Sequence, residues 1–356
     1  MPAALDVGVL QKQASAVSDA IGAIRRTMQK KDPRGRAWML RTLTVRRMFQ
    51  IVNEPRFRLE PVDLARVTQS LLELLACIEE TPAHADDGEI DPSLSATPSD
   101  RRMQTLYGLA WSQLSDAQYA DAADLLRQRL VGSNLSLDFL RDAKCVDVGT
   151  GITRFAVAMV QLGAGSVLGF DFSQECLAEA RRRLANMPES SKIELRWADI
   201  YDLPDDWNSS FDFACANGVI HHMADPKKAL AICHRLLKPS GYFFVFVFAG
   251  NEAPWWQTIE IMREIMAPVP IEYAAAVLNH SGTAGNAAFS VLDYSYTPIQ
   301  FKHQASWYEN AFKEIGFSAV HRLQGGAIHD SELRSRLFVS DSALYGVSEV
   351  RYLLRK

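Results

Sequence analysis

The 356-residue chain is long enough for two domains of the usual size, about 150 residues each. Its content of 48% hydrophobic and 22% charged residues is typical of globular proteins, and its net charge of −4 gives no reason to expect nucleic acid or an anionic membrane as a partner. The five dispersed cysteines indicate free thiols and a cytoplasmic location, since no disulfide framework, signal peptide or membrane-spanning run is recognisable.

The first 80 residues are expected to form a helical domain. Pro61 stands where the third helix of this domain would begin. Apolar residues recur at helical spacing in three segments, which are residues 10–28, 37–52 and 62–78.

The next part of the chain predicts a linker followed by more helix. Residues 81–100 are rich in Pro, Ser and Asp, which is typical of a loop or linker. Residues 101–134 predict a helical lid or connector. In this segment Tyr107, Trp111 and Tyr119 have spacings that gather aromatic rings on one helix face.

From residue 144 onward, short apolar runs alternate with amphipathic segments. This alternation predicts a doubly wound α/β domain over residues 135–356, with a parallel sheet covered by helices on both faces. Residues 251–304 interrupt the pattern and are interpreted as an insertion. Seven strands are expected, at 145–148, 167–170, 193–197, 211–216, 242–248, 317–323 and 349–354.

The first of these strands runs into a glycine-containing turn and then a helix. In open α/β sheets such a turn forms a ligand crevice at the carboxyl ends of the strands, where Gly149 and Gly151 would let the backbone approach the ligand. Asp171 ends the second strand, 22 residues beyond Gly149, where a carboxylate can accept both ribose hydroxyls of a nucleoside. The alternative is that Asp171 caps the next helix, but Ser173 is better placed for that role.

Two residues argue against a dinucleotide as the ligand of this crevice. An NAD-binding turn has a third glycine where the helix opens, and this chain has the bulky Arg154 there. Asp147 would place negative charge close to a diphosphate. The pattern therefore favours a ligand that carries an ammonium and a sulfonium group.

Residues 144–249 resemble the class I S-adenosylmethionine (SAM)-dependent methyltransferases, in the branch of ubiquinone-biosynthesis-type and other small-molecule enzymes. The resemblance implies a Rossmann-like seven-stranded sheet and SAM as the cofactor. Thr153 replaces a third glycine that is frequent in the family, and we expect this to alter helix packing without abolishing binding. The matching segments are VDVGTG (146–151), GFDFS (169–173), ADIYDLP (198–204), FDFACANGVIHHM (211–223) and LLKPSGYFFVFVF (236–248).

The resemblance also implies contacts with the methionine and ribose parts of the cofactor. Asp171 would hold the ribose. The methionine part would lie along the turn that follows the first strand, at Asp147, Gly149, Thr150 and Gly151.

Residues after the second, third and fourth strands would complete the cofactor site. Phe172 would lie beside the adenine, Asp199 would accept its amino group and Ile200 would pack on its ring. Asn217 and Gly218 would lie under the sulfonium, next to the incoming nucleophile.

Asn217 and His221 are the candidate catalytic residues. His221 or His222 could act as a general base, because histidine titrates near neutral pH. A pair of histidines at this place recurs in the family among enzymes with different substrates, which suggests a structural role instead. No cluster of side chains has metal-ligand spacing, so no metal is expected.

Aromatic residues outside the core of the α/β domain are the candidate substrate and lid residues. Aromatic faces attract a sulfonium cation and exclude water from a reacting centre. Ordinary core packing is the alternative for each of them. They are Tyr107 and Trp111 before the first strand and Trp255, Tyr294 and Tyr296 in the insertion.

Taken together, these features predict methyl transfer from SAM to a small-molecule nucleophile by SN2 attack. Two alternatives remain open: SAM-consuming chemistry at the aminocarboxypropyl carbon, which releases methylthioadenosine, and a catalytically inactive SAM-binding partner protein. The spread of Lys and Arg along the chain argues against a nucleic-acid substrate. The helical N-terminal region is a possible homodimer surface.

Overall fold

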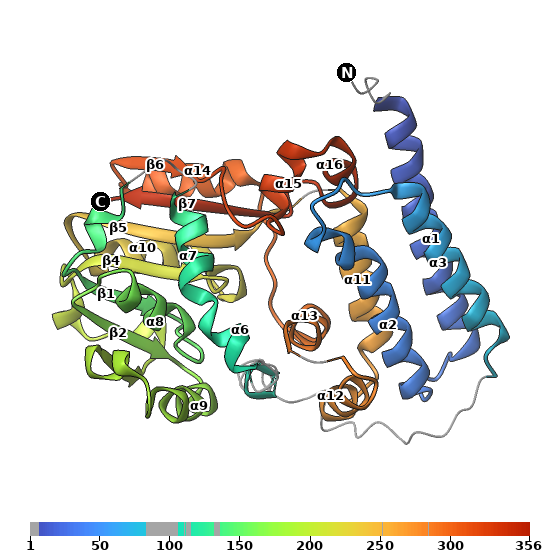
Figure 1. Ribbon diagram of the computed structural model, residues 1–356, viewed down its shortest axis with the longest axis horizontal. Coiled ribbons are helices and arrows are strands. Elements are labelled where there is room, and N and C mark those ends of the chain that lie inside the picture. Colours follow the sequence, from blue (N-terminus) through green and yellow to red (C-terminus); the bar gives the residue numbers. More distant parts are fainter. Residues whose placement is uncertain are drawn as a thin grey trace. The chain divides into compact units, whose positions relative to one another are not determined.

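The computed structural model describes residues 7–82, 106–109, 111, 115–131, 136–250, 252–283 and 285–356. The chain divides into two compact units, each built from three segments that are distant in sequence (Figure 1). The helical unit comprises residues 1–98, 251–297 and 328–348, and the sheet unit comprises 99–250, 298–327 and 349–356.

Three long helices form the N-terminal part of the helical unit, as the apolar spacing predicts. Helix α3 begins at Leu64 and not at Pro61, because the Asp63 side chain accepts a hydrogen bond from the Arg66 N–H and caps the first turn. The short helix η1 (Glu54–Phe57) follows α2. The three long helices are α1 (Val7–Lys31), α2 (Trp38–Asn53) and α3 (Leu64–Glu80).

Helices from two later segments complete this unit. Residues 251–297 group with the N-terminal helices in the structure, whereas the sequence-based division places them inside the methyltransferase domain. Helix α11 is central, since it contacts α1, α2, α13 and α16. The later helices are α11 (Pro254–Met266), α12 (Ile271–His280), α13 (Gly285–Tyr296), α15 (Ser331–Leu337) and α16 (Val339–Tyr345).

A fully buried ion pair joins these segments within the helical unit. The Arg334 guanidinium pairs with Asp341, and neither side chain is exposed to solvent. Arg334 also donates to the carbonyl oxygens of Arg58 and Glu60, and Asp341 accepts the Val62 N–H at 2.9 Å. Because burying a charge is costly without partners, this full set of hydrogen bonds is what makes the pair tolerable.

The sheet unit contains the seven expected strands. Their order in the sheet is β3-β2-β1-β4-β5-β7-β6, and β1 to β5 are parallel to their neighbours. The strands are β1 (Lys144–Val148), β2 (Ser166–Asp171), β3 (Ile193–Trp197), β4 (Phe211–Asn217), β5 (Leu237–Phe248), β6 (Ala319–Arg322) and β7 (Glu349–Arg355).

The sheet is parallel, as the alternating pattern predicts, except at β7. This strand lies between β5 and β6 and is antiparallel to both. Arg322, the last residue of β6, pairs with Tyr352 of β7, so the chain leaves β6 and enters β7 at the same end of the strands. A return at the same end gives an antiparallel pair, whereas a parallel pair needs a crossover to the opposite end.

Helices pack on this sheet through apolar residues. One core cluster contains Leu126 of α7, Met159 of α8 and Phe213 of β4, which places α7 and α8 against the sheet. Helix α10 packs on β4 and β5 and also contacts α14. The helices of the unit include α6 (Asp116–Ala120), α7 (Ala122–Val131), α8 (Arg154–Gln161), α9 (Gln174–Leu184), α10 (Pro226–Leu236) and α14 (Ala305–Ile315). In the described part of the chain, no helix has the length and apolar character required to cross a membrane.

Candidate functional site

The turn between β1 and α8 has a backbone that requires glycine. Gly149 has a φ of 64°, in the left-handed region. A Cβ atom at this position would lie 2.6 Å from the Cγ1 atom of Val219, which is shorter than any tolerable contact. The turn therefore runs directly against the loop that follows β4, and the two loops together form one wall.

Asp171, at the end of β2, fixes this turn. Its carboxylate accepts hydrogen bonds from the N–H groups of Gly151 and Ser173, both at 2.9 Å. Burial raises the pKa of Asp171, and the backbone hydrogen bonds counteract this effect. As expected, the helix cap is provided by Ser173, whose hydroxyl accepts the Cys176 N–H at 3.1 Å.

Asp147 and Thr150 support the turn without lining a cavity. The Thr150 hydroxyl donates to Asp147 Oδ2 at 2.7 Å, and both side chains are buried. Burial raises the pKa of Asp147 to about 7. The structure therefore places the Asp147 carboxylate in the interior next to the turn, and not on the surface that a ligand would touch.

A cavity of about 280 Å³ opens at the carboxyl ends of β1, β2, β3 and β4. All the lining residues belong to the sheet unit. Many of the residues singled out in the sequence meet on its wall: Gly149, Gly151, Asp171, Phe172, Asp199, Ile200, Asn217, Gly218, Tyr107 and Trp111.

Most of the other lining residues lie within the matched sequence segments, and His222 among them is one of the two candidate bases. The Tyr201 hydroxyl donates to the Asp225 carbonyl oxygen at 3.0 Å and accepts the Asp225 N–H at 2.8 Å, which holds one side of the wall. Ile299 reaches the wall from the segment after α13, far along the chain, and no local pattern marks it. The full additional set is Phe170, Ser173, Cys176, Ala198, Tyr201, Val219, His222, Met223, Ala224 and Ile299.

The two neighbouring histidines have different surroundings. His221 is buried, stacks on Phe248 with ring centres 3.8 Å apart, and accepts the Phe248 N–H at its Nδ1 atom. Burial lowers the pKa of His221 well below its usual value, with a smaller contribution from His222. His221 is absent from the cavity wall and His222 is present on it. The sequence prediction of His221 as a catalytic group thus has no support in the geometry.

His222 is held by a backbone carbonyl. Its Nδ1 atom lies 2.8 Å from the carbonyl oxygen of Ile299. Because a carbonyl oxygen only accepts, Nδ1 carries the hydrogen, and in the neutral ring the lone pair is on Nε2. Of the two histidines, His222 is therefore the one that can contact a ligand in the cavity.

The helices before β1 attach to the glycine turn. Thr153, at the place of the family's third glycine, has a φ of 70°, and its hydroxyl lies 3.0 Å from the Tyr119 hydroxyl of α6. Arg154 forms an ion pair with Asp121. Burial lowers the pKa of Arg154 to about 10. Thr153, which departs from the methyltransferase pattern, and Arg154, which departs from the dinucleotide pattern, thus anchor α6 and the residue that follows it.

The aromatic residues of the predicted insertion lie in the helical unit. Trp255 is 1% exposed and packs on Tyr294, with ring centres 5.5 Å apart, and on Phe49. The Arg56 guanidinium lies 5.1 Å from the Trp255 ring centre, and the Tyr296 hydroxyl donates to the Val269 carbonyl oxygen. Core packing is therefore what the structure shows for Trp255, because a side chain this buried cannot contact a substrate in the folded unit.

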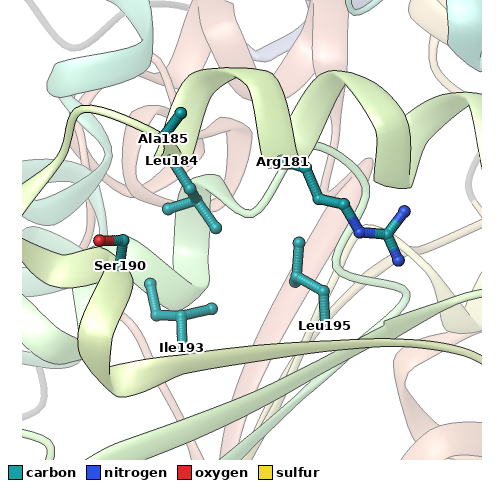
Figure 2. Close-up of a pocket in the computed structure, with 6 residues that line it drawn as sticks. All are labelled: Arg181, Leu184, Ala185, Ser190, Ile193 and Leu195. Carbon is teal, nitrogen blue, oxygen red and sulfur yellow. The ribbon is translucent and has the colours of Figure 1, made fainter.

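A second depression, of about 300 Å³, lies between α9 and β3 (Figure 2). Leu184, Ile193 and Leu195 point toward one another across it, as Figure 2 shows, and Arg181 and Ser190 are its polar lining residues. Ile193 begins β3, so this depression lies toward the amino end of the strand, whereas the cavity opens at the carboxyl end. Over the described residues, no group of three or more His, Cys, Asp or Glu side chains could hold a metal ion.

Comparison with known proteins finds methyltransferases. Residues 146–245 match a family model described as a methyltransferase domain. Over 179 residues, half of this chain, the sequence is 32% identical to the ubiquinone biosynthesis O-methyltransferase of Thiobacillus denitrificans, and the match covers 70% of that protein. Over 93 residues it is 39% identical to an uncharacterized 37.1 kDa protein in transposon TN4556 of Streptomyces fradiae, 26% of the length of each chain.

Other matches are shorter or more distant. The chain spans about half of the length of other ubiquinone biosynthesis O-methyltransferases, for example 54% of the one from Idiomarina loihiensis. A solved S-adenosylmethionine-dependent methyltransferase from Mesorhizobium loti is 18% identical, with a TM-score of 0.41 and coverage of 65% of this chain and 97% of that one.

The match to the Thiobacillus protein extends over 70% of that protein. The family model covers residues 146–245, which include most of the residues that line the cavity. The chain therefore belongs to the class I SAM-dependent methyltransferases, whose cofactor is SAM.

Proposed function

We propose that the sheet unit binds SAM in the 280 Å³ cavity and transfers its methyl group to a small molecule. The observation that carries this proposal is the meeting of Asp171, the glycine turn and Asn217 on one wall. In open α/β sheets ligands bind at the carboxyl ends of the strands, which is where this cavity opens. Its volume lies near the lower limit of about 300 Å³ that is usual for small-molecule sites.

The lining residues fit the parts of SAM. The Asp171 carboxylate accepts backbone N–H groups of Gly151, Ser173 and Phe172. A carboxylate has about four acceptor sites, so capacity remains for a ribose hydroxyl. Phe172 and Ile200 supply apolar contact for the adenine ring, and the exposed carboxylate of Asp199 can accept its amino group. Gly149 and Gly151 line the cavity, so the backbone of the turn is available to the methionine part.

SAM supplies an electrophilic methyl group on a sulfonium. Around it the protein acts mainly by position, since alignment of the reacting atoms contributes more than acid or base groups in an SN2 reaction. We assign Asn217 and Gly218 to the methyl-transfer centre and His222, in place of His221, as the candidate base. Tyr107 and Trp111 would shield the centre from water and attract the sulfonium by cation–π contact.

The acceptor is proposed to be a small molecule with an oxygen nucleophile, because the relative from Thiobacillus denitrificans is named as an O-methyltransferase. A cytoplasmic location and a homodimer through the N-terminal helices also remain proposals. The described cysteines are all free thiols, in keeping with the first. Light scattering of the purified protein tests the second.

Calorimetry with SAM and S-adenosylhomocysteine tests the cofactor site. We expect Asp171→Ala to weaken binding about 100-fold, since it removes a charge-assisted acceptor for the ribose. Asp171→Asn, which keeps one oxygen, should have an intermediate effect, and Asp206→Ala, at an exposed carboxylate, should have none. Thermal melting of each variant separates loss of binding from loss of folding.

The reaction products distinguish methyl transfer from aminocarboxypropyl chemistry. Mass spectrometry after incubation with candidate acceptors shows S-adenosylhomocysteine for methyl transfer and methylthioadenosine for aminocarboxypropyl chemistry. Absence of heat with SAM, or unchanged affinity in folded Asp171→Ala, would contradict the proposed site.

A further inference from the structure

Helix α7 carries an arginine on the face that it buries. Ala122, Leu126 and Leu130 are four residues apart and belong to the apolar core of the sheet unit. Arg129, next to Leu130, is only 6% exposed. Burial of a cation costs free energy unless hydrogen bonds compensate, so the contacts of this side chain indicate why it is there.

Arg129 contacts the ends of two neighbouring strands. Its Nη1 atom donates to Asn217 Oδ1 at 2.9 Å, and its guanidinium carbon lies 4.9 Å from the centre of the Phe246 ring. Asn217 of β4 and Phe246 of β5 are register partners in the sheet. The guanidinium is therefore stacked on one strand and hydrogen-bonded to the other, which fixes its position at the carboxyl end of β4.

This contact determines how the Asn217 amide is oriented. A guanidinium has only donors, so Asn217 must direct its oxygen toward Arg129. The amide nitrogen has no partner within the described part of the chain, and Asn217 lines the cavity. A hydrogen bond from a cation also polarises the amide and makes its N–H groups stronger donors. Asn217 thus offers the cavity a donor and not an acceptor.

We propose that Arg129 is a positioning residue that sets Asn217 to donate a hydrogen bond to an anionic oxygen of the methyl acceptor. The site would then select ionised hydroxyl compounds, such as phenolates, over amines, whose N–H groups would face another donor. This inference rests on the proposed function, because it assigns the acceptor class of the same cavity.

The reaction balances without another reactant. The hydroxyl proton leaves to solvent when the phenolate is formed. An electron pair of the oxygen then forms the bond to the methyl carbon as the carbon–sulfur bond breaks. The anionic oxygen and the sulfonium become a neutral ether and a neutral thioether.

An indicator phenol tests the role of Arg129. We use 4-nitrophenol, whose phenolate absorbs visible light and whose neutral form does not, together with the full-length protein saturated with S-adenosylhomocysteine. Absorbance is followed against pH. The amine analogue 4-nitroaniline serves as the matched probe without an ionisable hydroxyl.

In the wild-type complex we expect the bound phenol to have a pKa about one unit lower than in Arg129→Met, a roughly tenfold change in its ionisation constant. Arg129→Lys should restore part of the shift, since lysine donates but lacks the planar stacking group. Arg127→Met is the matched control. Arg127 lies on the same helix, is exposed and pairs with Asp124, so its loss should leave the spectrum unchanged. Binding of 4-nitroaniline should gain nothing from Arg129.

A second variant keeps the test decisive if Arg129→Met does not fold. Asn217→Asp retains an oxygen for Arg129 and replaces the NH2 group by oxygen, so it should raise the pKa of the bound phenol at least as much as Arg129→Met does. The proposal is overturned if the wild-type complex does not bind the phenolate, or if a folded Arg129→Met or Asn217→Asp ionises it equally well. Failure of S-adenosylhomocysteine itself to bind wild type would instead contradict the proposed function.

Discussion

The two units use the same kinds of side chain in opposite ways. The helical unit encloses Trp255 and the ion pair of Arg334 with Asp341. The sheet unit places Trp111 and Asn217 on a cavity wall. Residue type does not separate these uses. What separates them is position, because the ends of parallel strands leave polar groups and loops that helix-on-helix packing does not.

Replacement of each tryptophan by alanine gives the largest expected contrast. Trp255→Ala should lower the free energy of unfolding by about 3–5 kcal/mol, the usual cost of removing a large buried aromatic side chain, and leave the affinity of the folded protein for S-adenosylhomocysteine unchanged. Trp111→Ala should cost less stability and weaken that affinity. Denaturant unfolding and calorimetry measure both. A loss of cofactor binding in folded Trp255→Ala would break the comparison.

Asp147, a buried carboxylate of the sheet unit, should make the free energy of unfolding depend on pH. The pKa of Asp147 is raised to about 7 by burial, so the folded state holds a proton that the unfolded state releases above about pH 4. The contribution to stability is full below that pH and is lost as pH rises through 7. Asp147→Asn should remove this dependence. Compared with wild type, the variant should gain about 2–4 kcal/mol of unfolding free energy between pH 5 and pH 8. Denaturation at pH 5 and pH 8 measures it, with the exposed Asp206→Asn as control.

The smallest effect is expected where α6 meets the glycine turn. Tyr119→Phe removes the hydroxyl that lies 3.0 Å from the Thr153 hydroxyl, and should cost about 1 kcal/mol of unfolding free energy. In a Thr153→Gly background the partner is already absent, so the same change should cost much less. Equal costs in both backgrounds would show that the two hydroxyl groups are not coupled.

These contrasts also explain what the sequence could predict. The glycine turn follows the apolar strand β1, and Asp171 and Asn217 end β2 and β4, so their positions at the carboxyl ends of the strands follow from local pattern. Ile299 comes to the cavity through packing of a distant segment, and local pattern has no information on it.

Some differences between the predicted and the observed positions of side chains had a detectable signal in the sequence. Arg129 interrupts an apolar helical stripe at Leu126 and Leu130, and an arginine on a buried face is unusual enough to mark a site. Asp147 precedes the turn within β1, and a strand side chain can point into the interior as easily as toward a ligand. The aromatic pattern around Trp255 is the same for a core and for a lid, so only the structure could distinguish them.

The way the chain is divided between its units has a consequence for biosynthesis. Each unit needs three segments that are far apart in the chain, down to α16 in one case and β7 in the other. A ribosome that has produced the glycine turn and β1 to β5 has therefore completed neither unit. Both reach their full set of contacts only after α16 and β7 have been synthesised, so nascent chains carry exposed apolar surfaces until then and are natural clients for chaperones.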